Sequence, residues 1–248
     1  MDHSNRPPPV DHKPRGVIVG NYLQDSSWPS VQSFLQNLND EKKSYNPFNY
    51  VQAEMSNKTG DYDLYYLNNN STQSYEKLNL GAENLIFGIS NSDPERPFQK
   101  VVEGEVEFSN IIESYASHMN KNRLVDSLIG LLQNETSHMP DQTLSDFMGS
   151  PEEYIVDGVS KIKANYSGFW KNGHTRTSTL IMVDLDDNVE YYEFNLTANS
   201  VNRVEEWKIN SFKFKLKPLY KNNLPNSSSR LSISSLLCLL ASLLLLII

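Results

Sequence analysis

Residues able to do chemistry are few and widely spaced in this chain of 248 residues. It has no Gly-x-Ser-x-Gly nucleophile elbow, no P-loop, no His-Glu-x-x-His zinc motif and no Rossmann glycine fingerprint. Its single cysteine, Cys238, excludes an intramolecular disulfide, a thiolate zinc cage and an iron–sulfur cluster, because each needs at least two thiols. We therefore expect no catalytic residue and no resident metal.

Two weaker patterns also fit ordinary structural roles. Asp184, Asp186, Asn188 and Glu190 alternate as calcium ligands do, but the glycine and closing glutamate of an EF-hand are missing, so a hairpin turn is expected. The five histidines show no paired ligand spacing, and only His118 suggests a contact with a haem.

Composition and charge indicate a globular chain that does not bind nucleic acid. Hydrophobic residues make up 38% and charged residues 21%, which separates the sequence from collagen-like and fully disordered chains. The 22 Lys and Arg against 30 Asp and Glu give a formal charge of -8. That sign opposes the basic surface that phosphate binding requires.

The first half of the chain predicts a mixture of strands and helices. Residues 1–15 are rich in proline and are expected to be a disordered arm, and residues 16–24 are expected to form a buried strand. A helix should follow Trp28-Pro29-Ser30, because the next apolar residues recur every three to four positions. We further expect a hairpin of residues 48–55 and 61–67 and a buried strand at 84–90.

The second half predicts two helices followed by antiparallel strands. Helices are expected at 101–118 and 122–133, and a hairpin at 177–183 and 189–196. Phe212, Phe214 and Leu216 alternate with lysines, which predicts a last strand with one buried face. This order favours an α+β class, with one domain at 16–219 and a linker at 220–230.

The last eighteen residues, 231–248, suggest a membrane anchor. They hold no charged residue and nine leucines, and as a helix they would rise about 27 Å, close to the thickness of a bilayer's hydrocarbon core. We expect a C-terminal transmembrane helix, and a processed lipid-anchor signal is the alternative. The anchor residues of this interpretation are Leu231, Leu236, Leu240, Leu244 and Ile248.

Charge sets the expected orientation of that anchor. Six basic residues and no acidic residue lie between Glu206 and the tail, which favours a cytosolic body. The expected location is the cytosolic face of the endoplasmic reticulum or Golgi, with the mitochondrial outer membrane as the alternative. Seven Asn-x-Ser/Thr sequons are expected to stay unmodified, since chance accounts for most of them.

Four segments, in this order and spacing, resemble motifs of the Transport and Golgi Organisation 2 family. They are residues 16–24 (GVIVGNYLQ), 45–49 (YNPFN), 87–91 (FGISN) and 173–179 (GHTRTST). The likeness covers roughly residues 16–216. It implies a layered α/β/β/α sandwich of antiparallel sheets similar to amino-terminal-nucleophile hydrolases, and a role in secretory-pathway organisation, haem mobilisation and lipid homeostasis.

The resemblance also implies where this chain departs from its family. Members begin Met-Cys and carry an Asn-Arg-Asp-Glu segment soon after, whereas this chain begins Met1-Asp2, so we expect a fold incomplete at the amino terminus and no nucleophile. We expect a non-enzymatic factor in Golgi organisation and in haem or lipid trafficking. The alternative is an amide or thioester hydrolase, if an upstream cysteine exists.

By the same analogy, three residues are ligand-binding candidates. Asn91 would offer an amide to an oxyanion, Arg176 would bind a carboxylate or propionate, and Asn21 would line the same cleft. The implied ligands are haem, as a carried group, and an acyl lipid. No protein partner is indicated.

Overall fold

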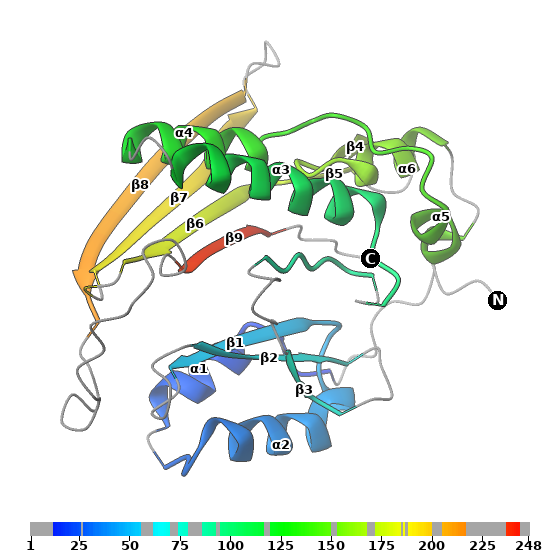
Figure 1. Cartoon of the computed structure of the whole chain (residues 1–248). Helices are drawn as coiled ribbons and strands as arrows, with labels where there is room; N and C mark the ends of the chain where they lie inside the picture. Colours follow the sequence, from blue (N-terminus) through cyan, green and yellow to red (C-terminus); the bar gives the residue numbers. More distant parts are fainter. Residues whose placement is uncertain are drawn as a thin grey trace. The chain divides into compact units, whose positions relative to one another are not determined.

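A computed structural model gives the structure of the chain. It describes residues 12–25, 27–55, 62–69, 74–78, 86–92, 95–116, 120–149, 153–167, 172–184, 186, 188–199, 205–216 and 237–243. The chain forms two compact units, the first made of residues 1–84 with 220–226 and the second of residues 85–219 with 227–248. Figure 1 labels the helices and strands of both.

The first unit combines two helices with a small antiparallel sheet. The strands are in the order β1-β2-β3, and β1 and β2 form the hairpin that the sequence predicted. Its elements are α1 (Val17–Gln24), α2 (Val31–Glu41), a 3-10 helix η1 (Lys42–Ser44), β1 (Asn49–Met55), β2 (Tyr62–Asn68) and β3 (Glu76–Leu78).

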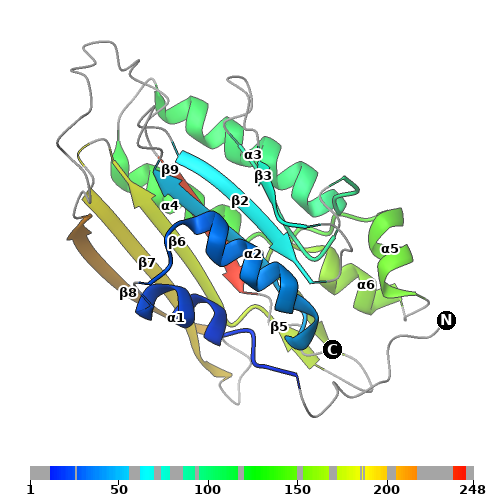
Figure 2. The ribbon, with the colours of Figure 1, turned by 90° about the horizontal axis from the view of Figure 1, so that it is seen from below.

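Helix α2 begins and packs as its sequence dictates. The Ser30 hydroxyl oxygen accepts a hydrogen bond from the Ser33 backbone N–H, and the Ser33 hydroxyl oxygen accepts one from the Ser30 backbone N–H, so the first turn has a capping box. Figure 2 shows α2 running alongside β2. The core formed there is aromatic and aliphatic: Ile18, Val31, Phe34, Leu35, Leu38, Tyr45, Phe48, Tyr65 and Leu67.

The strand expected at residues 16–24 is wrong, because Val17–Gln24 forms helix α1. Ile18 is buried and Tyr22, four residues later, packs against the same core, which is the spacing of one helix face. A short apolar run fits a strand and a buried helical turn equally well, and packing decided between them.

The second unit places helices over a larger sheet. The main sheet has the order β8-β7-β6-β9, and β4 pairs with β5 separately. The elements are α3 (Gln99–Ala116), α4 (Lys121–Leu132), α5 (Gln142–Met148), α6 (Glu153–Ser160), β4 (Asn165–Ser167), β5 (Asn172–His174), β6 (Thr177–Val183), β7 (Asn188–Asn199), β8 (Glu205–Lys215) and β9 (Leu237–Leu243).

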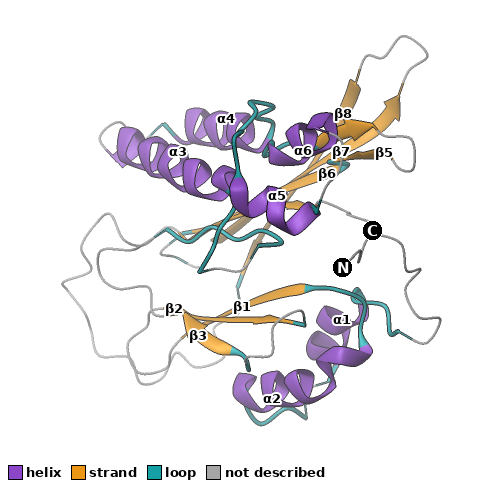
Figure 3. Ribbon diagram, turned by 90° about the vertical axis from the view of Figure 1, so that its right-hand side faces the viewer, coloured by secondary structure: helices purple, strands orange, loops and turns teal. Residues whose placement is uncertain are grey.

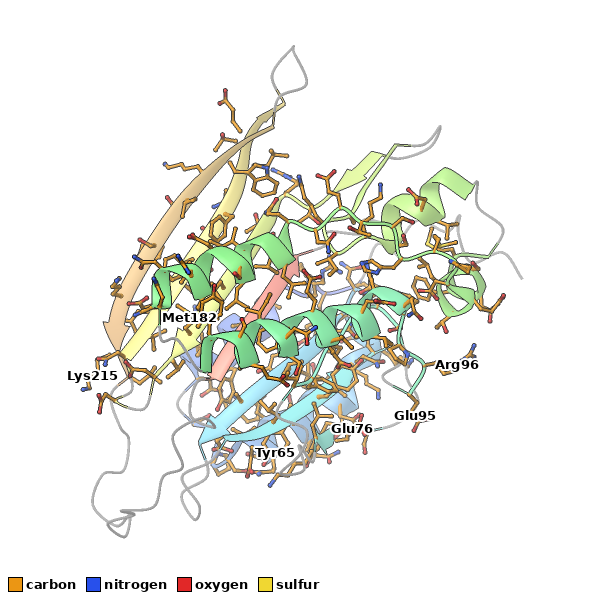
Figure 4. The ribbon with its side chains drawn as sticks, turned by 45° about the horizontal axis from the view of Figure 1, so that its top comes forward. Tyr65, Glu76, Glu95, Arg96, Met182 and Lys215 are labelled. Carbon is orange, nitrogen blue, oxygen red and sulfur yellow. The ribbon has the colours of Figure 1, made fainter. Side chains whose placement is uncertain are left out.

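Helix α4 packs its leucine face on strand β6. Leu124 and Leu128 share a core with Leu180 and Met182, which alternate along β6 and therefore point to one face of the sheet. Figure 3 shows α3 and α4 side by side, and Figure 4 places Met182 beside the helices. The two helices and the hairpin of β6 and β7 are confirmed.

The predicted C-terminal transmembrane helix is wrong. Leu237–Leu243 forms strand β9, which pairs antiparallel with β6 from Leu243 opposite Thr177 to Leu237 opposite Val183. None of the helices in the described part of the chain has the length and apolar composition to span a bilayer. Of the anchor residues, Leu240 lies in β9, while Leu231, Leu236, Leu244 and Ile248 lie outside the described residues.

The expectations for the fold class, the last strand and the amino-terminal arm have different outcomes. The α+β class with antiparallel sheets is confirmed, whereas the four-layer sandwich and the domain boundaries stay predictions. The buried face expected for the last strand is wrong, because Phe212, Phe214 and Leu216 are all exposed and β8 is the outer strand of its sheet among the described residues. Most of the expected arm at 1–15 lies outside the described residues.

Candidate functional site

Arg176 immediately precedes β6, and the sheet holds its backbone. Its carbonyl accepts the N–H of Leu196 at 2.9 Å, and the neighbouring Thr177 hydroxyl donates to Asn195 Oδ1 at 2.8 Å. The arginine side chain is exposed, and no acidic side chain in the described ranges forms an ion pair with it. A planar guanidinium in this position is able to hold a carboxylate or phosphate through two parallel hydrogen bonds.

Two buried hydroxyls flank Arg176. Thr175 is 1% exposed and Ser178 is fully buried, and neither hydroxyl has a hydrogen-bond partner within the part of the chain that the structure describes. The Thr175 backbone N–H donates to Ala164 O at 2.8 Å, which fixes the approach to β6. Arg176 is thus exposed and charged, whereas Thr175 and Ser178 are buried and Thr177 is half-buried.

Asn91 ends a segment that lies against helix α3. The strand expected at 84–90 is absent from its described part, residues 86–90. Instead of joining a ladder, the Gly88 N–H donates to Glu105 Oε1 at 2.5 Å. A Cβ at Gly88 would lie 2.8 Å from Val101 Cγ1, so only glycine fits this approach. Asn91 itself is half-buried.

Asn21 belongs to the first unit and is exposed on α1, where its carbonyl accepts the N–H of Asp25. Asn91 and Arg176 belong to the second unit. A cleft shared by all three therefore stays a prediction.

A buried ammonium group is found where α3 begins. Lys100 Nζ donates to the Val159 carbonyl at 2.8 Å, and that of Lys161 lies at 3.5 Å. Burial lowers the pKa of Lys100 from 10.5 to about 8, and the charge of Asp141 opposes that shift. Asp141 also caps α5, accepting the N–H of Leu144 at 2.8 Å. These contacts tie α3, α5 and α6 together, so we assign Lys100 a structural role.

A cluster of charged residues around Glu190 was not predicted from the sequence. Glu190 on β7 accepts hydrogen bonds from Lys121 Nζ at 2.6 Å, Tyr192 OH at 2.8 Å and Lys213 Nζ at 3.0 Å. Burial raises the pKa of Glu190, but these three donors outweigh it and hold the pKa at about 2. Burial, followed by the bond to Glu190, raises the pKa of Tyr192 to about 12. The only signal in the sequence was a Glu and a Tyr two residues apart on one strand face.

The alternating acidic residues form a turn, as expected. Asp184 Oδ1 accepts the backbone N–H groups of Asp186 and Asn188, both at 2.9 Å, which closes the connection from β6 to β7. Within the described residues, no group of three or more His, Cys, Asp or Glu side chains is arranged to hold a metal ion. His118, the haem candidate, lies outside those residues.

Comparisons with known proteins define the class of the chain. The family model for Transport and Golgi organisation 2 matches residues 1–198. A mouse (Mus musculus) relative named Transport and Golgi organization 2 homolog is 30% identical over 206 residues, which are 83% of this chain and 69% of the relative. The human (Homo sapiens) Transport and Golgi organization protein 2 homolog is 30% identical over 202 residues, 82% of this chain and 68% of the relative.

A more distant relative, Transport and Golgi organization protein 2 of Drosophila melanogaster, is 25% identical over 199 residues, 80% of this chain and 66% of that protein. The chain belongs to the Transport and Golgi organisation 2 family.

Proposed function

We propose that this protein acts in the organisation of the Golgi and the secretory pathway as a binding factor rather than an enzyme. The observation that carries the proposal is family membership, since the matching relatives are named for transport and Golgi organisation. The role of those relatives is thereby proposed for this chain.

Binding is favoured over covalent catalysis by the position of the thiol. Cys238 is the one cysteine of the sequence, and it lies within β9, opposite Met182 of β6. A nucleophilic thiol needs a base or a cationic group that lowers its pKa, and an amino-terminal nucleophile uses its own amine. A cysteine within a strand has no such amine.

Arg176 supports a carboxylate-bearing amphiphile as the ligand class, with haem and acyl lipids as examples. The guanidinium is exposed at the end of a sheet, and β6 continues from it into a strand that carries apolar side chains. One charge-assisted pair of this kind contributes about 1.5 to 3 kcal/mol. Half-buried Asn91 is the second proposed contact.

Titration of the full chain tests the proposal. Arg176→Ala should weaken binding of haem or of an acyl-CoA roughly ten- to a hundredfold, because about 1.4 kcal/mol corresponds to tenfold in affinity. Arg123→Ala, at an exposed position of α4, is the matched control and should bind like the wild type. Both variants should melt within a few degrees of the wild type.

Three results would count against it. Equal weakening by Arg123→Ala would show a nonspecific charge effect, and no binding below about 100 μM by the wild type would remove the carrier role. Release of free thiol from the acyl-CoA would instead favour a thioester hydrolase. In cells, depletion should disperse the Golgi, and wild type should restore it better than Arg176→Ala.

A further inference from the structure

The outer strand β8 leaves a long, partly apolar edge in the described part of the sheet. It spans eleven residues, Glu205–Lys215, and its pairing partner there is β7 alone. Ile209, Phe212 and Phe214 are 59%, 56% and 52% exposed. Figure 1 shows β8 as the outermost strand of its sheet. The outer strand of a sheet is a template on which another strand can pair.

We propose that β8 pairs antiparallel with β8 of a second copy of this chain, centred on Asn210, so that the two sheets continue across a two-fold axis. Symmetric dimers use one self-complementary patch on both copies, and an edge strand is such a patch. In this register the full length of each strand pairs, with Glu205 opposite Lys215 at both ends.

The order of charges along β8 favours a second copy as the occupant. Acidic residues stand at its start, Glu205 and Glu206, and a lysine stands at its end, Lys215. Antiparallel self-pairing therefore places Glu205 opposite Lys215 twice, once at each end, and opposite charges on facing strands are stabilising. Parallel pairing would place Lys215 beside Lys215.

The remaining lysines of β8 meet aromatic rings in the same register. Lys213 lies opposite Trp207, and Lys208 lies opposite Phe212. Ammonium groups are attracted to aromatic faces, and Trp207 already carries such a contact, with Lys163 Nζ 5.3 Å from its ring centroid. A shift of one residue towards the C-terminus would instead set Lys208 opposite Lys213, so like charges oppose a shift in that direction.

Lysines on edge strands commonly prevent association between sheets. The contacts that the lysines of β8 make within their own copy therefore bear on the proposed dimer. Lys213 Nζ lies 3.0 Å from Glu190 Oε1, so its ammonium group has an acidic partner within its own copy, although Lys121 shares that partner. Figure 4 labels Lys215 at the end of β8, and its side chain is exposed. The lysine whose charge is exposed at the strand end is the one that the register places opposite Glu205.

Sedimentation velocity of the full chain at several concentrations tests the pairing. Wild type should show a monomer–dimer equilibrium, and Lys215→Glu should raise the dissociation constant at least tenfold by setting glutamates opposite one another. The charge swap Glu205→Lys with Lys215→Glu should restore the dimer. Arg123→Glu makes the same charge change on exposed α4 and should leave the dimer intact.

A cross-link tests the register without depending on charge. In a Cys238→Ser background, Asn210→Cys should form an intermolecular disulfide on mild oxidation, because the register places residue 210 opposite its own copy, about 4.5 to 5.5 Å between Cα atoms. Phe214→Cys, eight residues from its own copy in that register, should not.

Four outcomes would overturn the proposal. The first two are a wild type that is monomeric at about 100 μM and equal effects of Lys215→Glu and Arg123→Glu on the dissociation constant. The other two are a charge swap that does not restore the dimer and equal cross-linking at positions 210 and 214. Binding of an acidic extended peptide at this edge by a monomeric wild type would identify a different occupant.

Discussion

The side-chain carbonyl of Asn69, immediately after β2, accepts a hydrogen bond from the backbone N–H of Phe48 at 2.9 Å. The amide of the same residue lies 3.0 to 3.3 Å from the carbonyls of Lys42, Tyr45 and Asn46. One buried side chain therefore holds the loop that carries the YNPFN motif against the end of a strand.

Asn69→Ala should lower the free energy of unfolding by about 2 to 4 kcal/mol, because it leaves a buried N–H and buried carbonyls unpaired. Chemical denaturation measures the loss. Asn37→Ala, at an exposed position of α2, is the matched control and should change stability by less than about 0.5 kcal/mol. Equal effects at the two positions would contradict the assigned role.

Gly88→Ala should destabilise the second unit by about 1 to 3 kcal/mol, since the new methyl would meet Val101 Cγ1 at 2.8 Å and Glu105 Cγ at 2.9 Å. Gly130→Ala supplies a control of opposite sign. It lies within α4 with nothing inside 4 Å, so an added methyl should stabilise the helix by about 0.5 to 1 kcal/mol. Thermal melts that move in the same direction would refute this account.

Locally determined elements were predictable from the sequence. The face of α4 and the hairpin of β6 and β7 follow from apolar spacing and turn residues, and both are present. In the site, Arg176 was correctly placed before β6. The Glu190 cluster was missed because Lys121 and Lys213 come from distant segments, and sequence spacing carries no information on such a meeting.

The pairing partners of the strands could not be predicted from the sequence, for a related reason. An apolar stretch such as Leu237–Leu243 satisfies the composition of a membrane helix as well as that of a buried strand. The difference lies in β6, whose seven residues pair with it from about sixty positions earlier in the chain. Alternation in β8 likewise predicts two faces but not which neighbours cover them, and Phe212 and Phe214 are exposed.

The stability of the wild type relative to Lys100→Met should rise with pH between 7 and 10, whatever constant cost comes from losing the hydrogen bond of Lys100 to the Val159 carbonyl. The folded pKa, about 8, is below the usual 10.5, so between these values the unfolded chain binds more protons and stability rises with pH. A shift of this size corresponds to about 3 kcal/mol. In denaturant titrations from pH 7 to pH 10, the free energy of unfolding should rise more for the wild type than for the variant. Parallel profiles would contradict the lowered pKa of Lys100. Lys208→Met, at an exposed strand position, controls for the loss of a lysine.

Glu190 should determine how the stability of the protein falls in acid. Its folded pKa of about 2 is below the usual 4.5, so the stability it contributes is present above pH 4.5 and is lost as pH falls towards 2. Glu190→Gln should cost about 1 to 3 kcal/mol at pH 7 and flatten that acid limb. Glu193→Gln on the same strand is the control, and an unchanged acid limb in Glu190→Gln would contradict the cluster's role.

Removing residues 231–248 should destabilise the second unit, because β6 would lose its partner along all seven positions from Thr177 to Val183. The edge of β6 that the deletion exposes should also promote association.

Two proline substitutions distinguish the loss of backbone pairing between β6 and β9 from the loss of apolar residues. The N–H groups of successive residues in a strand point to opposite edges, and proline has no N–H group. Of the two variants Leu239→Pro and Leu240→Pro, one therefore removes a hydrogen-bond donor that faces β6. The other removes a donor that faces the outer edge. Native-state hydrogen exchange of β6 should rise more in one variant than in the other. Equal exchange in both variants, or an unchanged melting temperature after deletion, would show that β9 does not stabilise the sheet.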